Sequence, residues 1–160
     1  MPSAGGLRPY LRTEHTSTRL SNRRLVLQAI FDEGPVSRAD LARATGLGKA
    51  TVSEIAGTLL AEGLVAEVGQ GSSTGGKPPT LLELDPGGRF AVAVDLSVRP
   101  IEAALLDLRG RIVVDVHGKT TVPSGRDAVE EIHRTVAELV GNASAPALGI
   151  GFGVPGVVDD

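Results

Sequence analysis

The apolar residues of this 160-residue chain change their spacing close to Pro86, and this change restricts the fold more than any other feature. Before Gly63 they recur every three or four residues, as in helices, whereas from Phe90 onward they mostly alternate, as in strands. The turn sequence Asp85-Pro86-Gly87-Gly88 separates the two regions. We therefore expect an α+β chain in two parts, with domains at 17–85 and 89–160 preceded by a flexible arm at 1–16.

Three helices are predicted in the first domain. The first extends from about Leu20 to Glu33, where the sequence Gly34-Pro35 stops it. Its apolar face is expected to consist of Leu20, Leu27, Ile30 and Phe31.

A glycine turn is expected between the second and third helices. Ser37 is predicted to cap the second helix, with Asp40 as its partner carboxylate, and this helix ends near Thr45. Gly46 can take a positive φ in the turn that follows. The third helix is predicted over 49–62, with an apolar stripe at helical spacing formed by Val52, Ile55, Ala56, Leu59 and Leu60.

Two short extended runs follow, at 64–68 and 80–84, on either side of a loop rich in glycine and proline at 69–79. The loop is too long for a tight hairpin turn, so we expect a two-stranded wing with a mobile tip. Three helices with a wing predict a winged helix-turn-helix, in which the third helix enters the major groove of duplex DNA.

The candidate DNA-binding residues are polar, basic or small side chains on these elements. On the third helix they lie opposite the apolar stripe or at the N-terminal edge: Lys49, Ala50, Thr51, Ser53 and Glu54. Phosphate contacts are expected from Arg19, Arg23 and Arg24 on the first helix and from Lys77 in the wing. Ser37 and Arg38, where the second helix begins, complete the set. The alternatives are an ordinary solvated surface or a module that binds proteins.

The formal net charge of −3 conceals an uneven distribution. Residues 1–89 hold ten basic and nine acidic side chains, whereas residues 90–160 hold six and ten. A basic front portion joined to an acidic second portion is compatible with a DNA partner for the first domain alone. The absence of cysteine excludes disulfides and thiolate metal sites in this chain, and the lack of a long apolar segment favours a cytoplasmic protein without a membrane partner.

The second domain is predicted to have the order βββαβ. Strands are expected at 90–98, 101–108, 111–118 and 147–152, the first three antiparallel and the fourth parallel to a neighbour. The helix between the third and fourth strands has an apolar stripe at Val129, Ile132, Val136, Leu139 and Val140. One helix leaves the other face of such a sheet uncovered, so we expect a truncated portion of a longer protein.

Several segments together resemble one family. Residues 37–53, 60–65 and 75–82 closely resemble the DNA-binding half of ROK-family regulators, a family of repressors and sugar kinases, and parts of 93–159 resemble the first strands of its actin-like (ribonuclease H-like) sugar-sensing domain. The resemblance implies a sequence-specific DNA-binding transcriptional regulator, a repressor of carbohydrate genes that is not an enzyme. It also implies that the intact protein is a homodimer that binds a palindromic operator and responds to a sugar or sugar-phosphate effector. No cofactor is expected in this chain, because the zinc site of the family lies in a part that the sequence lacks.

Two departures from the family pattern bear on function. The sequence Asp95-Leu-Ser-Val-Arg99 stands where the family's kinases have a glycine-containing phosphate loop, so ATP binding is not expected there. Gly48 stands where a serine usually caps the third helix.

An enzymatic alternative stays open beside the regulator. The chain would then be a fragment of a sugar kinase-like or metal-dependent nuclease-like enzyme of the ribonuclease H-like fold. In the nuclease case Asp95, Glu130 and Asp159 would hold magnesium, unless each is simply a surface carboxylate.

Overall fold

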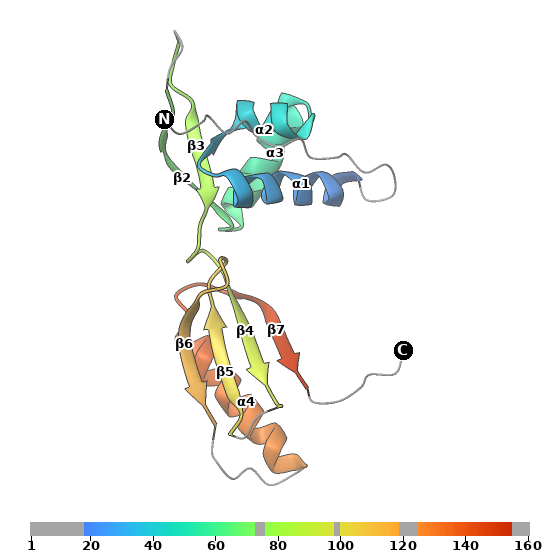
Figure 1. The fold of residues 1–160 in the computed structure, drawn as a ribbon, viewed down its shortest axis with the longest axis vertical. Helices are drawn as coiled ribbons and strands as arrows, with labels where there is room; N and C mark the ends of the chain where they lie inside the picture. Colours follow the sequence, from blue (N-terminus) through green and yellow to red (C-terminus); the bar gives the residue numbers. More distant parts are fainter. Residues whose placement is uncertain (1–17, 73–75, 98–99, 119–124, 155–160) are drawn as a thin grey trace, which may run out of the picture. The chain divides into compact units, whose positions relative to one another are not determined.

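The computed structural model describes residues 18–72, 76–97, 100–118 and 125–154. The chain divides into two compact units, unit 1 (Met1–Asp85) and unit 2 (Pro86–Asp160) (Figure 1). The arm predicted at 1–16 lies outside the described residues. None of the helices described is both long and apolar enough to cross a membrane.

The described part of unit 1 has three helices: α1 (Thr18–Glu33), α2 (Arg38–Thr45) and α3 (Lys49–Ala61). The first ends where predicted, because the Gly34 amide still donates to the Ile30 carbonyl at 2.9 Å and Pro35 has no N–H with which to continue. A Cβ at Gly34 would lie 2.6 Å from that carbonyl oxygen, so only glycine fits at this position.

The described part of unit 1 also has a three-stranded antiparallel sheet. It has the order β1-β3-β2 and consists of β1 (Val36–Ser37), β2 (Val65–Gln70) and β3 (Thr80–Leu84). The two longer strands confirm the extended runs expected from the sequence. The short strand β1 was not predicted, because two residues are too few to show an alternating pattern.

The apolar stripe predicted for α3 is confirmed, whereas the face predicted for α1 is partly wrong. Four of the five stripe residues of α3 are buried: Val52, Ile55, Ala56 and Leu59. In α1, however, Leu20 is 66% exposed and Phe31 is 41% exposed, and the buried residues are Val26, Ala29 and Ile30. Relative to the prediction, α1 is rotated about its axis, and the side that packs on α2 and α3 includes the small residue Ala29. A prediction based on the spacing of large apolar residues does not detect an alanine.

Unit 2 has a four-stranded sheet of order β6-β5-β4-β7 with α4 (Arg126–Gly141) on one face (Figure 1). Its strands are β4 (Phe90–Asp95), β5 (Glu102–Leu106), β6 (Ile112–His117) and β7 (Ala147–Gly153). The first three pair antiparallel and β7 pairs parallel to β4, which confirms the predicted βββαβ order and strand directions.

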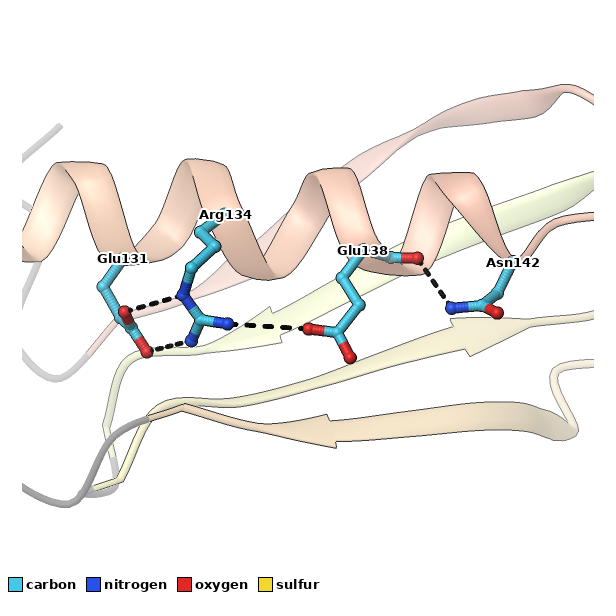
Figure 2. Close-up of polar contacts among 4 residues, drawn as sticks. All are labelled: Glu131, Arg134, Glu138 and Asn142. Carbon is cyan, nitrogen blue, oxygen red and sulfur yellow. Dashed lines mark hydrogen bonds and ion pairs between the residues drawn. The ribbon is translucent and has the colours of Figure 1, made fainter.

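The core of unit 2 lies between the sheet and α4, but the stripe predicted for α4 is partly wrong. Leu139 is buried as expected, whereas Val129 and Val140 are 52% and 45% exposed. Glu131 and Thr135 are buried in their place, because α4 turns the line Glu131–Thr135–Leu139 toward the sheet. The carboxylate of Glu131 accepts hydrogen bonds from the Nε and Nη2 atoms of Arg134 at 3.1 and 2.5 Å (Figure 2). A buried carboxylate needs such a partner, which an apolar pattern cannot reveal.

The hydroxyl of Thr135 provides a test of this packing. The side chain is fully buried, and its Oγ1 has no hydrogen-bond partner within the described part of the chain. Thr135→Val keeps the shape and removes the polar group, so we expect the free energy of unfolding of unit 2 to rise by about 1 kcal/mol. Urea unfolding measures the change.

Thr58→Val is the matched control, because the exposed Thr58 hydroxyl already donates to the Glu54 carbonyl at 3.1 Å and should yield no such gain. A loss of stability in Thr135→Val would show that the buried hydroxyl has a partner after all.

Candidate nucleic-acid interface

Side-chain and backbone hydrogen bonds close both ends of α2. The hydroxyl of Ser37 accepts from the Asp40 amide at 3.2 Å and donates to the Asp40 carboxylate at 2.6 Å, which confirms the predicted cap. Gly46 has the predicted positive φ, at 69°, and its amide donates to the Ala42 carbonyl at 3.1 Å. The Ser37 bonds define where α2 begins, and the Gly46 bond defines where it ends and the turn into α3 starts.

The side of α3 that faces away from the core carries small and polar residues. Lys49, Ala50, Ser53, Glu54 and Gly57 are exposed and Thr51 is half-buried, as predicted from the stripe. Gly48 is the N-cap and makes no side-chain capping bond, so the first amides of α3 are left to other partners. The exposed Lys49 therefore stands at the positive end of the helix dipole, a favourable place for an anion.

The basic side chains in the described part of unit 1 fall into two groups. Four arginines are paired with carboxylates of the same unit: Arg19 with Glu54, Arg23 with Glu62, Arg38 with Glu67 and Arg43 with Asp40. Arg24, Lys49 and Lys77 have no carboxylate partner among the residues described. Sequence reasoning missed this division, because the partners of Arg19 and Arg23 lie 35 and 39 positions away.

The two arginines of α1 that face α3 differ in their surroundings. Both terminal nitrogens of Arg23 donate to the carboxylate of Glu62, and this hydrogen bonding raises the pKa of Arg23 above its ordinary value. Arg19 donates through a single nitrogen to Glu54 Oε1 at 2.8 Å, and its side chain is 88% exposed. The Arg23 pair thus braces α1 against the end of α3, whereas the Arg19 pair is open to solvent.

The hairpin of β2 and β3 carries Lys77 close to its tip. Lys77 is exposed, and the Gly71 amide donates to the Pro79 carbonyl at 2.8 Å, which keeps the two sides of the loop together. Residues 73–75, within the predicted tip, lie outside the described residues. Arg38 at the start of α2 pairs with Glu67 on β2 at 3.0 Å, so the hairpin is tied to the helices.

Ser37 differs from the other candidate DNA contacts. Its residue surface is only 3% exposed, and its hydroxyl is already used in the cap of α2. The structure therefore assigns it a structural contribution, with no free polar atom for a phosphate.

The carboxylates of the enzymatic alternative lie only partly within the described residues. Asp95 Oδ1 accepts hydrogen bonds from the Ser97 hydroxyl and amide at 2.5 and 2.7 Å, and these bonds lower the pKa of Asp95. Glu130 is exposed on α4, and Asp159 lies outside the described residues. No group of three His, Cys, Asp or Glu side chains in the described ranges is placed to hold a metal ion.

Comparison with known proteins relates the chain to transcriptional regulators. Residues 25–69 match the family model described as the IclR helix-turn-helix domain. Over 150 residues the chain is 34% identical to the xylose repressor of Bacillus spizizenii and 35% identical to that of Bacillus subtilis. Each match covers 91% of this chain, and the chain spans only 39% of the length of these repressors.

The fold is similar to that of a solved structure. It matches a ROK family transcriptional regulator, a homologue of the E. coli MLC protein, with a TM-score of 0.67 and 21% identity. The match covers 88% of this chain and 36% of that chain, so both units take part in the likeness.

The cap of α2 generates a prediction for unit 1. Ser37→Ala removes the acceptor for the Asp40 amide, so we expect the free energy of unfolding to fall by about 1 kcal/mol. Ser53→Ala is the matched control and should not destabilise, because Ser53 is exposed within α3 and alanine favours a helix. Thermal unfolding distinguishes the two variants. Equal stability of Ser37→Ala and the wild-type chain would contradict the cap.

Proposed function

We propose that the chain belongs to the ROK family, that unit 1 is a winged helix-turn-helix that binds duplex DNA, and that the whole protein is a sequence-specific transcriptional repressor of sugar genes. The observation that carries the proposal is the outward face of α3. Its buried stripe fixes which side points to solvent, and that side carries Lys49 and short side chains. The relatives' names, which include xylose repressors, support the choice of sugar genes.

The outward face of α3 suits the major groove of DNA. The groove is about 12 Å wide and admits one α-helix, whose side chains then meet the base edges. Ala50, Ser53 and Gly57 keep the backbone of α3 close to those edges, and the hydroxyls of Thr51 and Ser53 can donate or accept. We assign base reading to this face.

The phosphate contacts are assigned from the pairing of the basic residues. Lys49 and Lys77 are exposed and have no carboxylate partner among the described residues, so they can meet phosphates without breaking an ion pair. Arg24 is exposed in the same way and stays a candidate. Arg19, Arg23 and Arg38 already contact carboxylates, so a phosphate would have to compete with Glu54, Glu62 and Glu67. The β2–β3 hairpin acts as the wing that brings Lys77 to the DNA backbone.

For unit 2 we propose the first portion of an actin-like sugar-sensing domain. Its βββαβ order and its likeness to the solved regulator support this assignment. For the whole protein we propose a homodimer, a palindromic operator, a sugar or sugar-phosphate effector and a cytoplasmic location. These are proposals because this chain spans only 39% of the length of the two xylose repressors. No observation in the described residues favours the kinase or nuclease alternative.

Selection from random duplexes tests the proposed function. The purified chain is incubated with a randomised duplex library, and the bound sequences are recovered and read. We expect a preferred sequence to emerge, because base edges are read by fixed side chains on α3. Recovery of a random pool, or binding that does not weaken as salt rises, would contradict sequence-specific DNA binding.

Replacement of the unpaired lysines tests the phosphate contacts. Lys49→Ala and Lys77→Ala should each make the slope of log affinity against log salt shallower by about 0.9, the value for one lost phosphate contact. Lys77→Ala should weaken binding to all sequences alike. Fluorescence anisotropy over a range of salt concentrations measures the slope.

Arg126→Ala is the matched control for this loss of charge. Arg126 is exposed at the start of α4 in unit 2, so its removal should leave the slope unchanged. An equal change of slope in the control and the lysine variants would show that the effect comes from net charge and not from contact.

Gly57 tests how closely α3 approaches DNA. Apart from the backbone of α3 itself, nothing lies within 4 Å of a Cβ built at Gly57, so packing within the described residues does not require glycine. Glycine inside a helix costs about 1 kcal/mol relative to alanine. We therefore expect Gly57→Ala to raise the melting temperature and yet to weaken DNA binding, because the new methyl group would lie between α3 and the bases.

Gly141→Ala is the matched control for Gly57→Ala. A Cβ at Gly141, the last residue of α4, also meets open space, so this change should stabilise unit 2 slightly and leave DNA binding as it was. Unchanged affinity in Gly57→Ala would contradict a close approach of this part of α3 to the groove.

A further inference from the structure

Glu54 occupies an unusual electrostatic position on the DNA-reading face proposed above. It is the only acidic residue of α3 (Lys49–Ala61), and its side chain is 64% exposed on the outward side beside Ser53. A lone carboxylate on this surface would repel the phosphates of a duplex. It can be favourable there only if it is neutralised by a cation or if it accepts a hydrogen bond from a base.

Arg19 supplies the cation and leaves one carboxylate oxygen available. Its Nη2 atom lies 2.8 Å from Glu54 Oε1, and no protein donor to Oε2 is found among the described residues. Arg19 and Glu54 border a cleft of about 330 Å³ between α1 and α3, with Leu20, Ile55 and Thr58 as further lining residues. The pair therefore lies at the rim of the reading helix, where a second partner can reach Glu54.

The neighbouring pair of Arg23 and Glu62 is less exposed than the pair of Arg19 and Glu54, and both of its carboxylate oxygens are occupied. Both oxygens of Glu62 accept from Arg23, and the two side chains are only 28% and 41% exposed. Glu62 also lies beyond the last residue of α3, at its C-cap. This second pair is thus an internal brace, and it offers a control of the same chemistry about one helical turn along α1.

We propose that Arg19 is a positioning residue that holds Glu54 so that Oε2 accepts a hydrogen bond from the N4 amino group of a cytosine in the major groove. This inference rests on the proposed DNA-binding function, and it replaces a phosphate contact as the contribution of Arg19. A carboxylate has acceptors only, and the cytosine amino group is the donor that acidic side chains read in the major groove. In free protein an exposed pair contributes little, but exclusion of water by the duplex strengthens it.

The test compares Glu54→Gln, Arg19→Gln, the double variant and Arg23→Gln with the wild-type full chain. Each is measured against the selected duplex and duplexes that carry the other base pairs at each position. We expect wild type to prefer a C·G pair at one position by about tenfold. Glu54→Gln should lose that preference in favour of A·T, because an amide pairs with adenine. Arg19→Gln should weaken the C·G preference at the same position. The double variant should show no further loss beyond that of Glu54→Gln.

The control variant and the salt dependence distinguish whether Arg19 positions Glu54 or contacts a phosphate. Arg23→Gln should lower the melting temperature and leave every base preference unchanged. For Arg19→Gln the salt slope should stay as in wild type. If Arg19→Gln instead weakens binding to all duplexes equally and makes the slope shallower by about 0.9, Arg19 contacts a phosphate and the proposal is overturned.

The remaining outcomes distinguish this inference from the proposed function. A wild-type chain that selects a sequence, with Glu54→Gln and Arg19→Gln selecting the same one, supports DNA binding and overturns only the assignment to Glu54 and Arg19. A wild-type chain that selects nothing overturns both. Both side chains are largely exposed, so melting temperatures near that of wild type will show that these variants are folded.

Discussion

The packing of one apolar stripe determines the arrangement of everything else in unit 1. Val52, Ile55, Ala56 and Leu59 are buried against neighbouring elements, so α3 cannot rotate without exposing them to water. Because the stripe determines which side of α3 faces the core, it also determines which side faces solvent. Lys49, Ser53 and Glu54 lie on that exposed side. The direction in which the candidate DNA-reading surface faces is therefore a consequence of hydrophobic burial.

Ion pairs between distant parts of unit 1 then refine the charge of that surface. Arg19 and Arg23 on α1 meet Glu54 on α3 and Glu62 at its C-cap, and Arg38 meets Glu67 on β2. These pairs offset much of the positive charge that a count of arginines suggests and leave Arg24, Lys49 and Lys77 without a carboxylate partner among the described residues. A chain of net charge −3 can thus still present positive side chains at the two places where a duplex would be contacted.

Apart from the short strand β1, the described elements of the fold could be predicted from the sequence, but the buried sides of two helices and the charge pairing could not. The Ser37 cap, the Gly46 turn and the α3 stripe are local patterns, and each is confirmed. The buried sides of α1 and α4 depend on what they pack against, which is why Ala29 and Glu131 are buried while Leu20 and Val129 are exposed. The Arg19–Glu54 pair joins residues 35 positions apart, beyond the reach of any local pattern. The DNA contacts themselves stay predictions.

An NMR titration of the chain with a duplex recovered by selection reports where DNA touches the protein. If α3 and the hairpin bind DNA, the amide signals of the first half of α3, from Lys49 to Glu54, and of Lys77 in the hairpin will shift on addition of DNA. The signals from α4 and from β4 to β7 will stay in place. Shifts confined to unit 2, or shifts in unit 1 that avoid the outward face of α3, would show that DNA does not bind through this face.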